Sequence, residues 1–295
     1  MFPIIPANTA AASFPENDEG IFGFGWTGSN TAATNLVSNA GVVSSDTAGV
    51  GTGRHGCTAT QYGGDKGIFG FGHDGSKTAI TNLVSNTGVV ASDTAAVGNP
   101  AHYPSACSYG GDKGIFGYGG IDGGVTAITK LVSNTGVVSS DVTGVGTARE
   151  GSAACEYGGD KGIFGYGSNP FSMTNLVSNA GVVSSDVTGV GTARGYPSAC
   201  SYGGDKGIFG YGGYYLSMSN LVSNAGVVAS DVTGVGTARS YLAACEYGGD
   251  KGIFGYGNTG SIVSMTNLVS NAGVVASDVT GVGTARRSLG ACSFN

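Results

Sequence analysis

The amino-acid sequence predicts an all-β fold built from six copies of one unit of about 45 residues. The motif Gly-Ile-Phe-Gly recurs at spacings of 47, 47, 48, 45 and 45 residues, beginning at Gly20, Gly67, Gly114, Gly162, Gly207 and Gly252. Glycine supplies 57 of the 295 residues, and no stretch has the apolar 3.6-residue period of a helix. Repeats of this length, with short apolar stretches between turn residues, are typical of β-propellers, and an open β-solenoid, whose coils are usually shorter, is the alternative.

Each unit is expected to form four short antiparallel strands. In the fourth unit the first strand is 154–157, and a Gly-Gly-Asp-Lys turn leads into the second strand at 163–166. The third strand is 174–178, an Asn-Ala-Gly turn follows, and the fourth strand runs over 182–186. The predicted fold is therefore a six-bladed β-propeller of four-stranded antiparallel blades. The end units look ordinary, which favours a closed ring over an open solenoid with atypical caps.

The chain ends indicate how the ring closes, because the first-strand pattern occurs seven times. The copy at 290–294 keeps the Ala-Cys pattern, whereas the copy at 10–14 lacks the cysteine and the Gly-Gly-Asp-Lys turn. We therefore predict one propeller domain over residues 10–295, closed by pairing of 290–295 with the strand at 21–24. Residues 1–9 would form an N-terminal arm.

The unit as a whole resembles the Kelch repeat, from about residue 10 to residue 295. It contains an Arg, a few small residues, Tyr, Gly-Gly-Asp-Lys, an apolar strand with glycines, a variable loop and Thr-Asn-Leu-Val-Ser-Asn. Gly-Tyr-Gly replaces the Kelch double glycine, and Val replaces the Kelch tryptophan. The near-identical units also resemble repeat proteins of marine phages, encoded near tail and other structural genes. These resemblances imply a Kelch-like propeller in a virion, made in the host cytoplasm with its cysteines reduced.

Differences among the six copies predict a binding face. Every internal length change falls between the second and third strands, and a second variable patch follows the repeated Arg. In an up-and-down sheet these two connections lie on one face. That face is also expected to carry seven aromatic side chains: Trp26, Tyr103, Phe171, Tyr196, Tyr214, Tyr215 and Tyr241. Loops on a rigid scaffold often bind ligands, although loops also vary where nothing restrains them.

The repeated arginine has two alternative roles. It recurs in five units and is replaced by Ala101 in the sixth. Its guanidinium could bind a carboxylate or a sugar hydroxyl of a ligand, with Arg149, Arg194 and Arg239 as the candidates, or it could join neighbouring units through carbonyls and the repeated Asp.

Other chemical motifs point away from catalysis and cofactors. His55, His73 and His102 are expected to be polar loop residues rather than metal ligands, and no Cys-x-x-Cys occurs. Five of the six cysteines take one position in different units, which predicts buried, reduced thiols without disulfides. Thirteen basic residues against nineteen acidic ones, and no long apolar run, predict neither nucleic-acid binding nor a membrane span.

These patterns predict a non-enzymatic binding or structural protein without metal or cofactor. With the phage resemblance, we expect a tail or surface component that contacts a host glycan or another virion protein. One alternative is an intracellular Kelch-type protein-interaction module. A second is a glycan-active enzyme, which would need two carboxylates about 5–10 Å apart. On the variable face the sequence offers Asp74, Asp122 and Glu150 without an evident pair.

Overall fold

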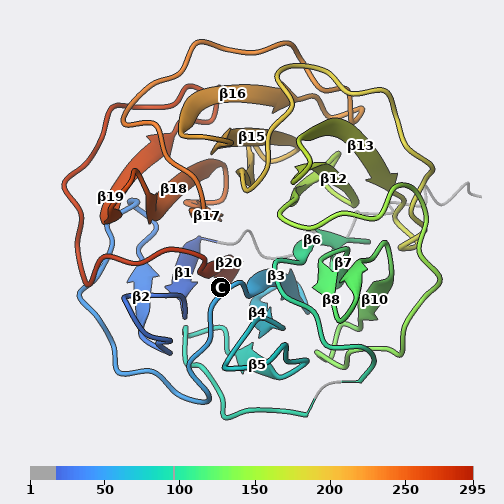
Figure 1. The fold of residues 1–295 in the computed structure, drawn as a ribbon. Helices are drawn as coiled ribbons and strands as arrows, with labels where there is room; N and C mark the ends of the chain where they lie inside the picture. The colour runs from blue at the N-terminus through green and yellow to red at the C-terminus, as the bar shows by residue number, and fades with distance from the viewer. Residues whose placement is uncertain (1–17, 96, 295) are drawn as a thin grey trace, which may run out of the picture.

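The protein is described by a computed structural model covering residues 18–95 and 97–294. In this part of the chain there are twenty strands and no helix. Eighteen strands form six three-stranded antiparallel sheets, arranged in a ring around a common centre (Figure 1). The other two, β8 (Gly120–Ile121) and β9 (Gly124–Val125), form a separate hairpin. The all-β prediction is confirmed, and the predicted arm at 1–9 lies outside the described residues.

Each sheet contains an inner, a central and an outer strand. The inner strands are, from sheet 1 to sheet 6, β20 (Gly290–Phe294), β3 (Thr58–Tyr62), β6 (Ser105–Tyr109), β11 (Ala153–Tyr157), β14 (Ser198–Tyr202) and β17 (Ala243–Tyr247). The central strands are β1 (Glu19–Gly23), β4 (Lys66–Gly70), β7 (Lys113–Gly117), β12 (Lys161–Gly167), β15 (Lys206–Gly212) and β18 (Lys251–Asn258). The outer strands are β2 (Thr34–Val37), β5 (Thr81–Val84), β10 (Thr129–Val132), β13 (Phe171–Val177), β16 (Leu216–Val222) and β19 (Ile262–Val269).

The predicted fourth strand does not form a continuous ladder, so the sheets have three strands rather than four. In sheet 4 it meets β13 only at two isolated bridges. Two side chains, Asn175 and Ser184, provide further bonds here. Asn175 Nδ2 donates to Ser184 O at 3.0 Å and to Asp186 Oδ1 at 2.9 Å. The Leu176 N–H donates to Ser184 Oγ at 2.9 Å. These local side-chain bonds compete with ladder pairing and turn the chain out of the sheet.

The two ends of the chain meet in sheet 1. Strand β20 pairs antiparallel with β1, from Glu19 opposite Phe294 to Gly23 opposite Gly290. The predicted pairing of the C-terminal segment with the first central strand is confirmed. A backbone hydrogen bond also crosses this junction: the Gly248 N–H, in the turn of sheet 6, donates to Asp18 O, next to β1, at 2.8 Å. The ring is thus continuous from sheet 6 to sheet 1.

The Gly-Ile-Phe-Gly motif is explained by contacts between neighbouring sheets. A Cβ atom at Gly210 of sheet 5 would lie 2.7 Å from Cζ of Phe254 in sheet 6. A Cβ atom at Gly252 of sheet 6 would lie 2.5 Å from Sγ of Cys200 in sheet 5. Both side chains are buried. The first glycine of the motif therefore accommodates the preceding sheet, and the second glycine accommodates the aromatic ring of the following sheet.

Gly210→Ala is expected to lower the free energy of unfolding by about 1–3 kcal/mol, because the added methyl group overpacks the contact with Phe254. Urea unfolding would measure the loss. In combination with Phe254→Leu, which removes part of the ring, the loss should be smaller than the sum of the two single effects. Additive effects would contradict this account of the motif.

All six cysteines are free and buried, as predicted. Burial raises the pKa of each thiol, that of Cys292 to about 12. Cys57 lies outside the repeated position, which Thr60 occupies opposite Ile68. The thiols therefore stay protonated at neutral pH and fill the space between sheets as small apolar groups.

Candidate functional site

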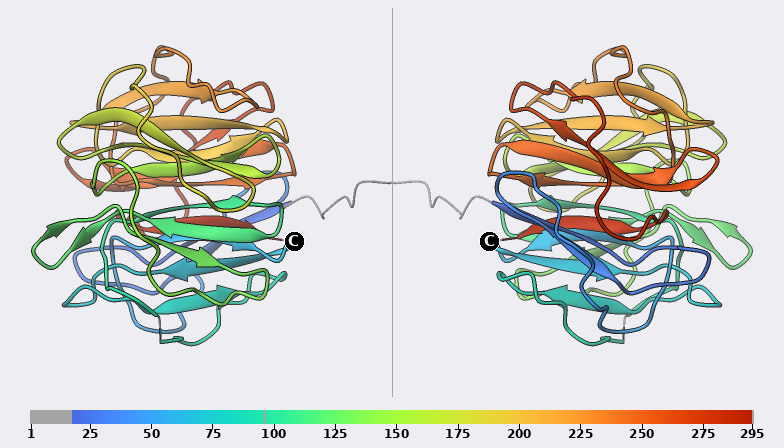
Figure 2. Two further views of the ribbon diagram at one scale, coloured as in Figure 1. Left: turned by 90° about the vertical axis from the view of Figure 1, so that its right-hand side faces the viewer. Right: turned by 90° about the vertical axis from the view of Figure 1, so that its left-hand side faces the viewer.

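The variable connections lie on one face of the ring, here called the variable face. The green hairpin β8–β9, which belongs to the loop after β7, projects on one side in Figure 2, and the C-terminus lies on the opposite side. The invariant Gly-Gly-Asp-Lys turns follow the inner strands, on the side where the chain ends. The structure thus separates variable loops from invariant turns.

A closed ring of six backbone hydrogen bonds organises the centre of the variable face. Around the ring each N–H donates to the next carbonyl oxygen, at 2.7–3.3 Å, in the order Gly56, Ser288, Tyr241, Tyr196, Gly151, Tyr103 and back to Gly56. All six residues have positive φ angles between 50° and 62°. Two are glycines for a steric reason as well: a Cβ atom at Gly151 would lie 2.6 Å from the Tyr196 ring. The ring of bonds thereby fixes three tyrosines at the centre.

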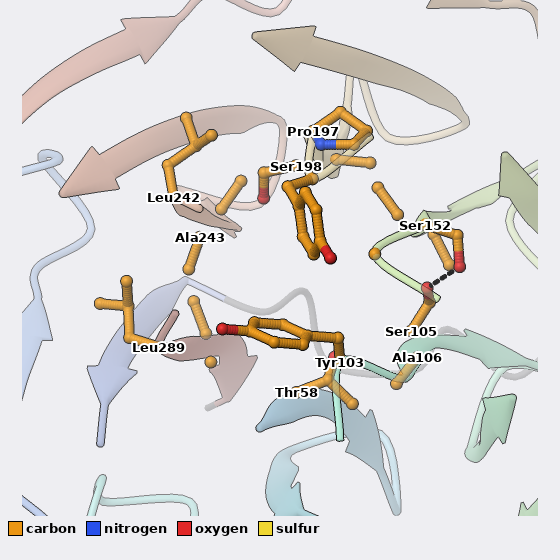
Figure 3. A pocket seen from close by; sticks show the side chains of 18 of the residues that line it. Thr58, Tyr103, Ser105, Ala106, Ser152, Pro197, Ser198, Leu242, Ala243 and Leu289 are labelled. Atoms are coloured by element: carbon orange, nitrogen blue, oxygen red, sulfur yellow. Dashed lines mark hydrogen bonds between the residues drawn. The ribbon is translucent and has the colours of Figure 1, made fainter. Parts of the chain in front are cut away.

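These three tyrosines, Tyr103, Tyr196 and Tyr241, are here called the central tyrosines. The rings of Tyr196 and Tyr241 stack at 4.2 Å, and Tyr103 lies 5.2 Å from Tyr196. They line a cavity of about 90 Å³ together with Leu242 and Leu289. Figure 3 shows Tyr103, Leu242 and Leu289 around this cavity. Their half-buried rings present apolar faces beside phenolic hydroxyls, a combination suited to sugars and to protein side chains.

Hydrogen bonds orient two of the central tyrosines. The Tyr103 hydroxyl lies 3.2 Å from Ser288 Oγ, and the Tyr196 hydroxyl donates to Glu150 Oε1 at 3.4 Å. Burial and the negative charge of Glu150 raise the pKa of Tyr196 far above its usual value. The phenol therefore remains a neutral donor across the physiological pH range.

The structure brings the three histidines together next to the central tyrosines. The His55 ring lies 5.3 Å from both the Trp26 and the His73 rings, and His102 lies 5.0 Å from Tyr103. Trp26 also exchanges two backbone hydrogen bonds with Arg287, at 2.9 and 3.1 Å. Within the described residues no group of three or more His, Cys, Asp or Glu side chains could hold a metal. The clustering itself could not be read from the sequence.

The other three predicted aromatic residues are a second group by their place in the chain: Tyr214 and Tyr215 lie between β15 and β16, and Phe171 lies in sheet 4. The Tyr214 side chain is 98% exposed and that of Tyr215 is 41% exposed. Asn258 Nδ2 donates to the Tyr215 hydroxyl at 3.4 Å, so this tyrosine reaches toward the loop of sheet 6. Phe171, at the start of β13, is partly buried. Among the described ring contacts, none joins this group to the central tyrosines.

The repeated arginines do not reach the surface, which corrects their inclusion in the binding face. Arg149, Arg194 and Arg239 are 0–1% exposed. The Arg194 guanidinium lies 4.2 Å from the centre of the Tyr166 ring. It donates to Asn220 Oδ1 at 2.7 Å in the next sheet. The structural alternative therefore holds: these arginines join neighbouring sheets.

The one unit without this arginine contains a compensating change. Where the other units have Arg, this unit has Ala101, and where the other outer strands have Asn, β10 has Lys130. The buried Lys130 Nζ lies 4.9 Å from the centre of the Phe71 ring and 3.1 Å from Asp141 Oδ1. Each junction between neighbouring sheets thus holds a cation over an aromatic ring. The cation is the repeated arginine at five junctions and Lys130, from an outer strand, at the sixth.

The opposite face has a larger hollow that the sequence reasoning missed. Its volume is about 250 Å³, and its lining includes Gln61, Ser108, Glu156, Ser201 and Glu246. These residues all follow the cysteine position of an inner strand, where serine alternates with Glu or Gln around the ring. This alternation is visible in the sequence and could have indicated a polar hollow on this face. Burial raises the pKa of Glu156, although a hydrogen bond from Ser108 acts in the opposite direction.

No known family model matches this chain, and the curated proteins include no detectable relative. Its described portion has no helix that could cross a membrane.

Proposed function

We propose that the chain is a six-bladed β-propeller of Kelch-like type that acts as a non-enzymatic binding module. The fold proposal is supported by six sheets of one pattern around a centre and by the pairing of β20 with β1. The binding proposal rests chiefly on the aromatic side chains of the variable face. This is the face where the repeat copies differ, and the central tyrosines there are fixed by a closed hydrogen-bond ring.

A glycan is the ligand that these side chains fit best. Aromatic rings stack on the apolar faces of sugars, and hydroxyl and amide groups bond their polar edges. Tyr214 is 98% exposed and contributes little to packing, while Asn258 and Tyr215 form a polar pair beside it. We propose a host surface glycan as the ligand and a phage tail or virion surface as the setting. If the partner is another virion protein instead of a glycan, we propose that it binds to the same face.

Two alternatives use the same face and differ in what is bound or done there. An intracellular Kelch-type module would bind a protein and no saccharide. A glycan-active enzyme would turn over its sugar, using carboxylates of this face. Glu150 lies near His102 and accepts from Tyr196, and Asp122 pairs with Lys77 at 3.0 Å.

Changing Tyr214 and Tyr215 together to Ala is expected to weaken glycan binding by about 1–3 kcal/mol, the usual cost of removing aromatic anchors. The melting temperature should stay the same, because the Tyr214 side chain is exposed. A glycan array would identify the ligand, and calorimetry would measure its affinity. Val182→Ala is the control, because Val182 is 67% exposed beside an invariant turn. Loss of binding in this control, with none in the tyrosine variant, would mean that the other face binds.

A further inference from the structure

One cation on the variable face has no carboxylate partner among the described residues. The chain has thirteen Lys and Arg residues. Five arginines and Lys130 are buried, and six lysines each pair with an aspartate. Arg287 remains: it is partly exposed, and no described carboxylate lies within 4.0 Å of its guanidinium. That guanidinium lies 5.7 Å from the centre of the Tyr241 ring.

All three histidines of the chain and its only tryptophan lie in the same sector as Arg287. We call Trp26, His55, His73, His102 and Arg287 the cationic patch. The patch combines the indole ring of Trp26 with the permanent positive charge of Arg287 and three imidazole rings. The protein as a whole has a net charge of −6, so Arg287 has the opposite sign to the net charge.

Among the described hydrogen bonds of His55 and His73, the ring nitrogen involved is Nδ1 and none uses Nε2. His55 Nδ1 lies 2.7 Å from Asn30 Oδ1, and His73 Nδ1 accepts from the Gly75 N–H at 3.3 Å. An amide oxygen accepts, so His55 carries a proton on Nδ1 and gains a second donor at Nε2 when protonated. Glu150 Oε2 is 3.5 Å from His102 Nε2, so this histidine already has an acidic neighbour.

We propose that the cationic patch binds the acidic group of a saccharide, so that the ligand of the variable face is an anionic glycan. This inference rests on the proposed function and names its ligand class. In this arrangement Arg287 and the His55 and His73 Nε2 edges donate to a carboxylate or sulfate. The Trp26 ring and the central tyrosines receive the sugar ring.

The histidines make this binding depend on pH. Burial lowers the pKa of His55, and the nearby charges of His73, His102 and Arg287 lower it further. The other charged groups around the patch are Asp74, which follows His73, Glu150 beside His102, and the Lys77–Asp122 pair of the neighbouring loops. A bound anion relieves the repulsion among the cations. Affinity should therefore rise as the pH falls through the histidine range, while the ligand stays ionised.

Calorimetry with three oligosaccharides of equal length tests the proposal: an oligogalacturonate, a sulfated chondroitin fragment and a neutral malto-oligosaccharide. At low salt, at least one anionic probe should bind roughly tenfold more tightly at about pH 5.5 than at about pH 7.5. Arg287→Gln should weaken that binding about tenfold, and His55→Gln should reduce its pH dependence. Lys161→Gln is the matched control, because it removes one positive charge from the opposite face.

The outcomes separate this inference from the proposed function. Tight binding of the carboxylated probe alone, or of the sulfated probe alone, supports the inference and identifies the acidic group. Equal affinity for neutral and anionic probes, or an equal effect of Arg287→Gln and Lys161→Gln, overturns the inference and leaves glycan binding intact. If no saccharide binds at either pH, both proposals are wrong. Circular dichroism would verify that each variant is folded.

Discussion

Deletion of the last eight residues, 288–295, is expected to lower the free energy of unfolding by more than about 5 kcal/mol, which is enough to unfold a typical domain. The deletion removes β20, its five residue pairs with β1, and the buried side chains of Cys292 and Phe294. It also breaks the central hydrogen-bond ring at Ser288. Urea unfolding followed by circular dichroism would measure the loss.

Deletion of residues 1–9 is the control for this experiment. These residues precede every described strand, and their removal should change the free energy of unfolding by less than about 0.5 kcal/mol. If the N-terminal deletion were the more damaging of the two, a segment before β1 and not β20 would complete sheet 1.

Arg194→Ala is expected to cost about 3–5 kcal/mol of stability, although the residue lies in a connection and not in a strand. The arginine is buried, and its loss leaves Asn220 Oδ1, Tyr211 O and Thr192 O without the donors that now lie 2.7, 2.8 and 3.1 Å away. It also leaves a cavity over the Tyr166 ring. Thermal and urea unfolding of the variant would give the magnitude.

The chain contains its own rescue for this variant. Adding Asn220→Lys to Arg194→Ala reproduces the natural combination of Ala101 and Lys130, with a lysine positioned to reach the Tyr166 ring and Asp231. The double variant should regain a substantial part of the lost stability, and Asn220→Lys alone should be destabilising, because two cations would then share one buried site. A double variant no more stable than Arg194→Ala would show that the Ala101–Lys130 pair is not a compensation.

The sequence was most informative where structure is local. The inner, central and outer strands begin and end close to where Gly-Gly-Asp-Lys and Asn-Ala-Gly turns predicted them, because these turns depend only on adjacent residues. Comparison of the two end segments also predicted the β20–β1 pairing. The fourth strand was wrong because Asn175 hydrogen-bonds a segment nine and eleven residues later, and propensity reasoning treats such residues as independent.

The candidate site was predicted only in part. The variable face followed from loop lengths within the chain, and the exposed Tyr214 lies in one of these loops. The role of the repeated arginines stayed open between ligand binding and structure, because a repeated position alone does not reveal whether a side chain faces a ligand or a neighbouring sheet. Burial at 0–1% and the bonds to Asn and carbonyl groups decide that question.

By itself, the sequence determined the repeat, the inner, central and outer strands, the turns between them and the partner of the last strand, since each depends on short-range pattern or on comparison of like segments. Only the tertiary structure decided that His55, His73 and His102 meet beside Trp26 and Arg287. These residues come from different units, and the closed ring brings them together near its centre. The distances between these side chains depend on the radius of the ring and on the packing between sheets, and neither can be read from the sequence of a single unit.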